Sequence, residues 1–158
     1  MKKGSRNPLL RLCFLAYCGL MLWLLFGGNR SAVTADYWQQ VQANMNLTPL
    51  HTVKLYLYLL KHTSSEYLLQ HAFVNLLGNV GMFIPLGIFL PAVFPKLAKF
   101  WKCLISAALI ICAVELSQLF TLLGSCDVDD LILNLLGVAM GYWIYLIFKR
   151  PKGKKSTE

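Results

Sequence analysis

Four long apolar stretches dominate the chain, at residues 9–26, 71–94, 104–123 and 131–148. Each has close to the roughly 20 residues that a helix needs to cross a hydrocarbon core about 30 Å thick. Most charged residues lie between these stretches or beyond them. The pattern therefore predicts an all-α protein, a membrane-embedded bundle of about four transmembrane helices.

The long segment between the first two stretches, residues 28–70, has a helical pattern of its own. Leu50, Val53, Leu57 and Leu60 recur at helical spacing, with polar side chains among them. A helix with one apolar and one polar face lies along a membrane surface. We therefore expect an interfacial helix in this first outer loop.

The first apolar stretch is open to two interpretations. Residues 1–11 are basic, residues 12–26 are apolar, and residues 33–35 resemble a small-residue cleavage site. This outline is typical of a signal peptide. Because two leucines extend the apolar run upstream, we expect it to be retained as a helix. Cleavage would leave the orientation of the other three helices unchanged.

Composition supports the membrane assignment and explains the net charge of +8. Hydrophobic residues make up 57% of the chain and charged residues 14%, against roughly 45–50% and about 25% in soluble domains. All but three of the 15 Lys and Arg residues lie near the two termini or in residues 95–103. Basic residues that flank apolar stretches mark the cytoplasmic side. We therefore predict a multi-pass protein of the bacterial cell membrane, with both termini in the cytoplasm and no nucleic-acid partner.

This topology assigns a side to every connecting segment. Residues 1–150 form one transmembrane domain, and residues 151–158 form a disordered cytoplasmic tail. Cys126, in the short link between the last two stretches, is expected outside the cell, and Cys103 inside. The five cysteines have no metal-ligand or disulfide spacing, so we expect them to be packing residues.

Polar side chains inside the apolar stretches are the candidate functional residues. His71, Asn75 and Asn79 recur every four residues and share one helix face. Glu115 and Gln118, three residues apart, share a face of the third stretch. A charged residue at membrane depth costs about 2.5–3.5 kcal/mol on insertion scales, so Glu115 marks a functional site by default.

The last stretch carries an acidic start and an amide on one side. Asp127 and Asp130 lie directly before it, and Asn134 lies in its first turn. Asp130 and Asn134 share a face with Gly137 and Gly141, whose spacing lets another helix approach closely. We expect this face to point into the bundle.

Polar residues from three of the predicted helices lie at a similar height in the membrane. At 1.5 Å per residue, Asn79, Gln118 and Asn134 lie about 21–22 Å above the cytoplasmic ends of their stretches. Glu115 lies at about 17 Å. We therefore predict an outward-facing pocket in the outer half of the membrane. Its residues are Asn79, Glu115, Gln118, Asp127, Asp130 and Asn134, with His71 and Asn75 as additional candidates.

Structural roles are an open alternative for several of these residues. Asp127 suits an N-cap, and Asp129 and Asp130 suit the first turn of a helix. Asp129→Asn, about 100° round the helix from Asp130, is expected to be milder than Asp130→Asn. The amides would otherwise be interhelical hydrogen bonds, worth about 0.6 kcal/mol each. No cofactor is predicted, but Glu115, Asp127 and Asp130 are the candidates for a hard divalent cation such as Mg²⁺.

Four motifs follow one another between residues 46 and 145: NLTP from Asn46, NVGMFIPLG from Asn79, ELSQLF from Glu115, and DVDD from Asp127 through to Gly137. In order and spacing they resemble the VanZ-like family of bacterial membrane proteins. The residues that carry over are Asn79, Pro85, Glu115, Gln118, Asp127, Asp130 and Asn134. Many relatives have an arginine shortly before the aspartates, whereas this chain has Leu-Gly-Ser-Cys at residues 123–126.

The resemblance implies a role in the cell envelope and leaves the chemistry open. The family is named for a protein linked to resistance against teicoplanin, a lipid-bearing glycopeptide antibiotic. The leading hypothesis is a pocket in the bilayer that binds a lipoglycopeptide or another lipopeptide antibiotic, or a cell-wall lipid. One alternative is a metal- or acid/base-dependent enzyme acting on an envelope lipid. Another is a small ion-coupled carrier, which would need oligomerisation to supply enough helices.

Overall fold

The computed structural model describes residues 8–27 and 36–149, and these are almost entirely helical. The elements in chain order are α1 (Pro8–Phe26), α2 (Tyr37–Ala43), β1 (Met45–Asn46), α3 (His51–His62), α4 (Glu66–Val93), the 3-10 turn η1 (Pro95–Leu97), α5 (Phe100–Thr121), β2 (Cys126–Asp127) and α6 (Val128–Phe148). The signal-peptide cleavage site considered at residues 33–35 and the tail at residues 151–158 lie outside the described residues.

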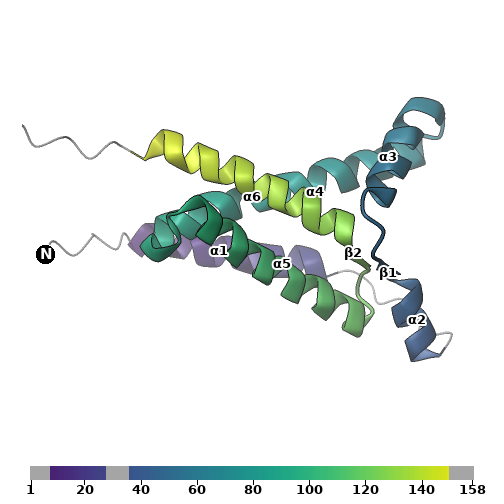
Figure 1. The fold of residues 1–158 in the computed structure, drawn as a ribbon, viewed down its shortest axis with the longest axis horizontal. Coiled ribbons are helices and arrows are strands. Elements are labelled where there is room, and N and C mark those ends of the chain that lie inside the picture. Colours follow the sequence, from purple (N-terminus) through teal and green to yellow (C-terminus); the bar gives the residue numbers. More distant parts are fainter. Residues whose placement is uncertain (1–7, 28–35, 150–158) are drawn as a thin grey trace, which may run out of the picture.

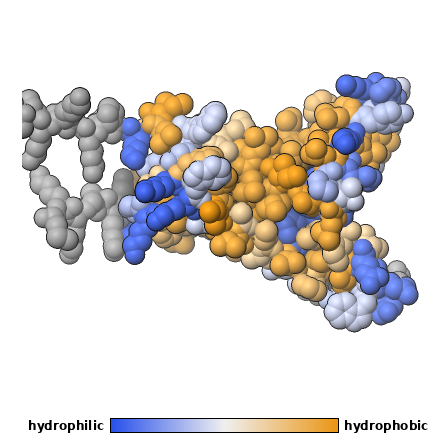
Figure 2. Space-filling view, in the orientation of Figure 1, coloured by the Kyte–Doolittle hydropathy of each residue, from blue (hydrophilic) through white to orange (hydrophobic). Residues whose placement is uncertain are grey.

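Four of these helices, α1, α4, α5 and α6, are long and apolar enough to cross a membrane. They confirm the predicted all-α membrane bundle, although α4 and α5 begin about one turn earlier than the apolar pattern indicates. The four helices run alongside one another, while α2, α3 and the two short strands gather at one end (Figure 1). Hydrophobic residues cover the middle of the bundle, and hydrophilic residues lie at its two ends (Figure 2).

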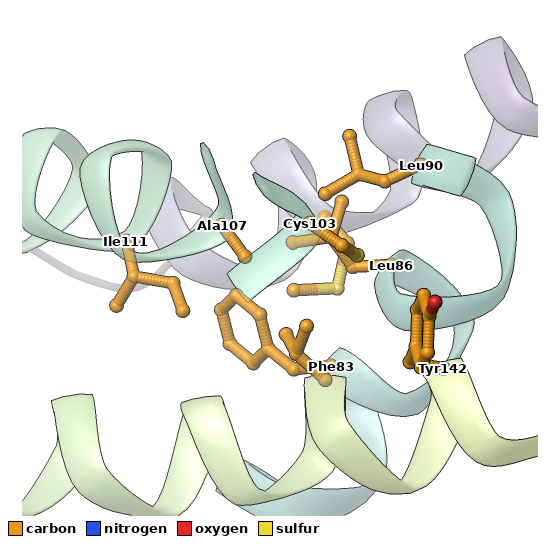
Figure 3. Close-up of a cluster of buried hydrophobic side chains, with 9 residues drawn as sticks. Phe83, Leu86, Leu90, Cys103, Ala107, Ile111 and Tyr142 are labelled. Carbon is orange, nitrogen blue, oxygen red and sulfur yellow. The ribbon is translucent and has the colours of Figure 1, made fainter. Parts of the chain in front are cut away.

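The apolar core lies between α4, α5 and α6 (Figure 3). On α5 it contains Cys103, Ala107 and Ile111, which are spaced four residues apart and fully buried. The same buried stripe of α5 continues to Glu115 and Leu119. A carboxyl group therefore occupies one position of an otherwise apolar, inward-facing stripe.

The glycines of α6 pack directly against the backbone of α4. A Cβ atom at Gly137 would lie 2.1 Å from the carbonyl oxygen of Val80, and one at Gly141 would lie 1.9 Å from that of Ile84. Gly87 of α4 makes the reciprocal close contact with the backbone of α6. These contacts confirm that the glycine face of α6 points into the bundle.

The helix predicted in the first outer loop is α3. Val53 and Leu60 on one side are half-buried, whereas Lys54 and Lys61 are exposed. Leu57, which belongs to the apolar face, is 48% exposed in the isolated chain. Exposed apolar area beside basic residues is typical of a helix that lies at a membrane surface.

Candidate functional site

The candidate site forms where the first outer loop returns to the start of α6. Strand β1 pairs in parallel with β2, with Met45 opposite Cys126 and Asn46 opposite Asp127. The backbone N–H of Cys126 also donates to the carbonyl oxygen of Asn44 at 2.9 Å. This short pairing places the loop and the beginning of α3 against the N-terminus of α6.

Asp127 joins three segments at this point. Its Oδ1 accepts the backbone N–H of Asp129 at 2.8 Å, which confirms the predicted N-cap of α6. Its Oδ2 accepts the Thr52 hydroxyl at 2.6 Å and the Asn46 side-chain amide at 3.1 Å. Because both carboxylate oxygens are occupied, Asp127 serves mainly to hold the loop and α3 on α6.

Asp129 does more than the sequence pattern predicts. It is fully buried, and its carboxylate accepts the backbone N–H groups of Leu50 at 2.5 Å and Val53 at 3.0 Å. Leu50 is the N-cap of α3, and its side chain cannot accept a hydrogen bond. Asp129 therefore caps α3 from a different helix. The sequence could have indicated this contact, because the apolar Leu50 at the start of α3 leaves the first N–H groups of that helix without a local acceptor.

These two bonds give Asp129→Asn an expected effect on the stability of α3. Asparagine retains one acceptor oxygen, so one of the two N–H groups at the start of α3 loses its partner. A buried donor without a partner costs roughly 1–3 kcal/mol. We expect faster amide hydrogen exchange at Leu50 and Val53. Asp36→Asn, at an exposed carboxylate, is the matched control, and unchanged exchange in the Asp129 variant would show that this cap is dispensable.

Asp130 and Asn79 join α6 to α4. The side-chain amide of Asn79 donates to Oδ1 of Asp130, which is half-buried. One turn further along α6, Asn134 is 3% exposed, and its Oδ1 has no hydrogen-bond partner. The inward face of α6 thus carries a paired carboxylate followed by an unpaired amide oxygen.

Glu115 is the second buried side chain with an unpaired oxygen. It is 8% exposed, and its Oε2 has no hydrogen-bond partner. The side chain lies close enough to interact with the backbone amide of Asp127 and with the carboxylates of Asp127 and Asp130. Glu115 and Asn134 each lie six residues from the helix end that borders the α5–α6 link, which is about 9 Å along the axis. We call Asn79, Glu115, Asp127, Asp130 and Asn134, which are buried or half-buried acidic and amide side chains at this level of α4, α5 and the start of α6, the acid–amide cluster.

Three predicted site residues have their polar contacts elsewhere. The side-chain amide of Gln118 donates to the carbonyl oxygen of Leu25 at 2.8 Å, which ties α5 to α1. Asn75 donates to the carbonyl oxygen of His71 at 2.9 Å, within its own helix. His71 is exposed and lines an open hollow of about 220 Å³ together with Tyr67, Gln70 and Val74. Of the three predicted residues on α4, which are His71, Asn75 and Asn79, Asn79 is the one that bonds to an acidic side chain of α6.

Tyr56 of α3 is a further residue at this site. Its ring centroid lies 5.9 Å from that of His71. Burial, and then the nearby charges of Asp130 and Asp127, raise the pKa of the Tyr56 phenol. Helix α3 therefore places an aromatic side chain next to the carboxylates of α6, which the sequence indicates only as a tyrosine near the membrane surface.

The carboxylates do not converge as metal ligands do. Within residues 8–27 and 36–149, no group of three or more His, Cys, Asp and Glu side chains is arranged to hold a metal ion. Glu115, Asp127 and Asp130 therefore do not form the predicted candidate cation site in this arrangement.

A bundle of four membrane-spanning helices, with a buried acid–amide cluster beneath an amphipathic helix, defines a small multi-spanning membrane protein. The sequence profile of the family described as VanZ/LLP1 matches residues 14–149. Because the match covers most of the chain, the protein belongs to the VanZ/LLP1 family, as its motifs indicate. No curated protein and no solved structure matches the chain.

Proposed function

We propose that this protein acts in the cell envelope by binding the polar part of an amphiphile at the acid–amide cluster. The amphiphile would be a lipopeptide antibiotic such as teicoplanin or a cell-wall lipid. The observation that carries the proposal is the pair of buried, unpartnered oxygens on Glu115 and Asn134. Leaving such an atom unpaired costs roughly 1–3 kcal/mol, and a ligand that engages both oxygens explains why the cost is tolerated.

The surroundings of the cluster suit a ligand with an apolar chain. The cluster lies towards the end of the bundle where β1 pairs with β2, and the sides of the bundle are hydrophobic (Figure 2). The first turn of α3 is bonded to Asp127 through Thr52. Further along α3, Leu55, Leu57 and Tyr58 are 46%, 48% and 60% exposed. A polar head at the cluster would leave the apolar chain free to lie along these side chains and along the lipid-facing helices.

The orientation of the protein bears directly on this function. The basic residues at the other end of the bundle are exposed, and those in the described part of the chain are Arg11, Lys96, Lys99, Lys102 and Lys149. Because cytoplasmic loops are enriched in Lys and Arg, this end is proposed to face the cytoplasm of a bacterial cell. The cluster would then face outward, where antibiotics and cell-wall precursors are encountered.

Cysteine labelling tests this orientation. Cys126 is expected to react with an impermeant maleimide applied to intact cells. Labelling is expected to speed up as the pH rises, because burial and then the nearby Glu115 carboxylate raise the pKa of its thiol. Cys103 is unsuitable as the cytoplasmic reporter because it is fully buried. A cysteine introduced at the exposed Lys96 is expected to react only after permeabilisation; the reverse pattern would place the cluster on the cytoplasmic side.

The proposed function is tested by teicoplanin susceptibility with and without the protein, alongside saturable binding of teicoplanin to the purified chain. We expect the protein to raise the concentration needed to kill the cells and to bind without turnover. A chelation-sensitive reaction on an envelope lipid would instead indicate an enzyme. Voltage- or pH-dependent flux in vesicles would indicate a carrier. Unchanged susceptibility together with no binding of teicoplanin or cell-wall lipid would reject the proposal.

A further inference from the structure

The fully buried polar atoms of the acid–amide cluster that have no partner are all oxygens. The buried oxygens of the cluster without partners are Oε2 of Glu115 and Oδ1 of Asn134. Both atoms accept hydrogen bonds, and an ionised carboxylate and an amide oxygen have no proton to donate. A group that satisfies both must therefore bring its own N–H or O–H donors.

The side-chain donors that bond to Asp127 and Asp130 are already engaged. Asn79 donates to Asp130, and Asn46 donates to Asp127 and to Thr52. The Thr52 hydroxyl also donates to Asp127. These donors already serve the carboxylates, whereas a phosphate or carboxylate ligand needs several donors of its own.

The charges around the site also favour a ligand group that donates hydrogen bonds. The charged groups acting on Glu115 are the carboxylates of Asp127 and Asp130, and those acting on Asp130 are Asp127 and Asp129. Like charges grouped at reduced dielectric repel an anion and attract a cation. The cluster therefore favours a ligand group that is both positively charged and rich in hydrogen-bond donors.

From these observations we infer that the cluster recognises a protonated primary amine. This inference rests on the proposed function and specifies the polar head of its ligand. An ammonium group has three N–H donors and one positive charge, which suit the unpaired acceptors of Glu115 and Asn134 and the acidic side chains of the cluster. It also fits better than a bare divalent metal ion, because the described carboxylates are not arranged as a metal site.

Binding of matched amphiphiles to the full-length protein in neutral detergent tests this inference. The probes are dodecylamine, which is protonated at neutral pH as a lysine side chain is, and dodecyltrimethylammonium, which has the same charge and chain but no N–H. We expect dodecylamine to bind roughly tenfold or more tightly than the trimethyl analogue, as the loss of charge-assisted hydrogen bonds predicts. Ethylamine distinguishes a free amine from a lipid headgroup, and we expect it to bind more weakly than dodecylamine because it lacks the apolar chain.

Two substitutions connect this preference to the cluster. Glu115→Gln and Asn134→Leu are each expected to reduce dodecylamine affinity by roughly tenfold. Glu66→Gln, at an exposed acid on α4, should leave the affinity unchanged. Asn134→Leu is also expected to keep or raise the thermal unfolding midpoint of the unliganded protein, because it removes an unpaired buried oxygen. This variant therefore separates lost binding from lost folding.

The outcomes distinguish failure of this inference from failure of the proposed function. Equal affinity for the amine and its trimethyl analogue would refute recognition through N–H groups. Tighter, Glu115-dependent binding of dodecyl phosphate would overturn the amine inference and leave an amphiphile site in place. If no amphiphile, including teicoplanin, binds in a manner that depends on Glu115 or Asn134, both proposals are rejected.

Discussion

Gly141→Leu is expected to lower the thermal unfolding midpoint in detergent more than any other substitution considered for the bundle. A Cβ at this position would lie 1.9 Å from the carbonyl oxygen of Ile84 and 3.0 Å from the Cα of Gly87. Both atoms belong to the backbone of α4, so no side-chain rotation relieves the overlap, and the helices must separate. Overpacking costs typically about 1–3 kcal/mol and occasionally more. We expect Gly141→Leu to lower the free energy of unfolding by about 3 kcal/mol or more, because separation of the helices also pulls Asn79 away from Asp130.

The matched control is a glycine in the same helix pair that has open space around it. A Cβ at Gly81 of α4 would meet no neighbouring atom within 4 Å, so Gly81→Leu is expected to be neutral or slightly stabilising through its higher helix propensity. Gly137→Leu should resemble Gly141→Leu, and Ala139→Leu should be milder. Equal losses at Gly141, Gly81 and Ala139 would contradict the assignment of the α4–α6 interface.

The sequence predicts those features that depend on patterns along one helix. The apolar runs indicate the four spans, the glycine spacing indicates the inward face of α6, and the leucine spacing indicates α3. Asp127 is predicted as an N-cap because its acceptor and the N–H group of Asp129 lie two residues apart. These features are local in the chain, so residue spacing determines them.

Features that join distant segments could not be predicted in this way. Asp129 accepts the N–H group of Leu50, 79 residues away, and nothing in the spacing of α6 indicates where the first outer loop returns. Gln118 has the predicted depth, but its side chain bonds to the backbone of Leu25 in α1. Depth along a helix therefore identifies a level in the membrane without identifying which neighbour a side chain faces.

Glu115→Gln is expected to abolish most of the protein's activity while leaving its membrane abundance nearly unchanged. Glutamine keeps the size of the side chain and one acceptor oxygen, but it removes the negative charge in the buried α5 stripe. A ligand held through that charge would lose a charge-assisted hydrogen bond, which corresponds to roughly a tenfold loss or more. Asp130→Asn is expected to act in the same direction, since it removes the charge beside Asn79. The readout is survival under teicoplanin, or lipid binding if no drug phenotype exists.

The most direct test is therefore a teicoplanin dose–response comparison of Glu115→Gln with Glu66→Gln at matched membrane abundance. Both variants replace one glutamate with glutamine, but Glu66 is exposed at the start of α4 and Glu115 is 8% exposed inside the bundle. We predict that Glu115→Gln shifts the dose–response curve to that of cells lacking the protein, and that Glu66→Gln leaves the curve unchanged. Full protection by Glu115→Gln, repeated with Asp130→Asn, would contradict a ligand site and leave the acid–amide cluster as a purely structural contact between helices.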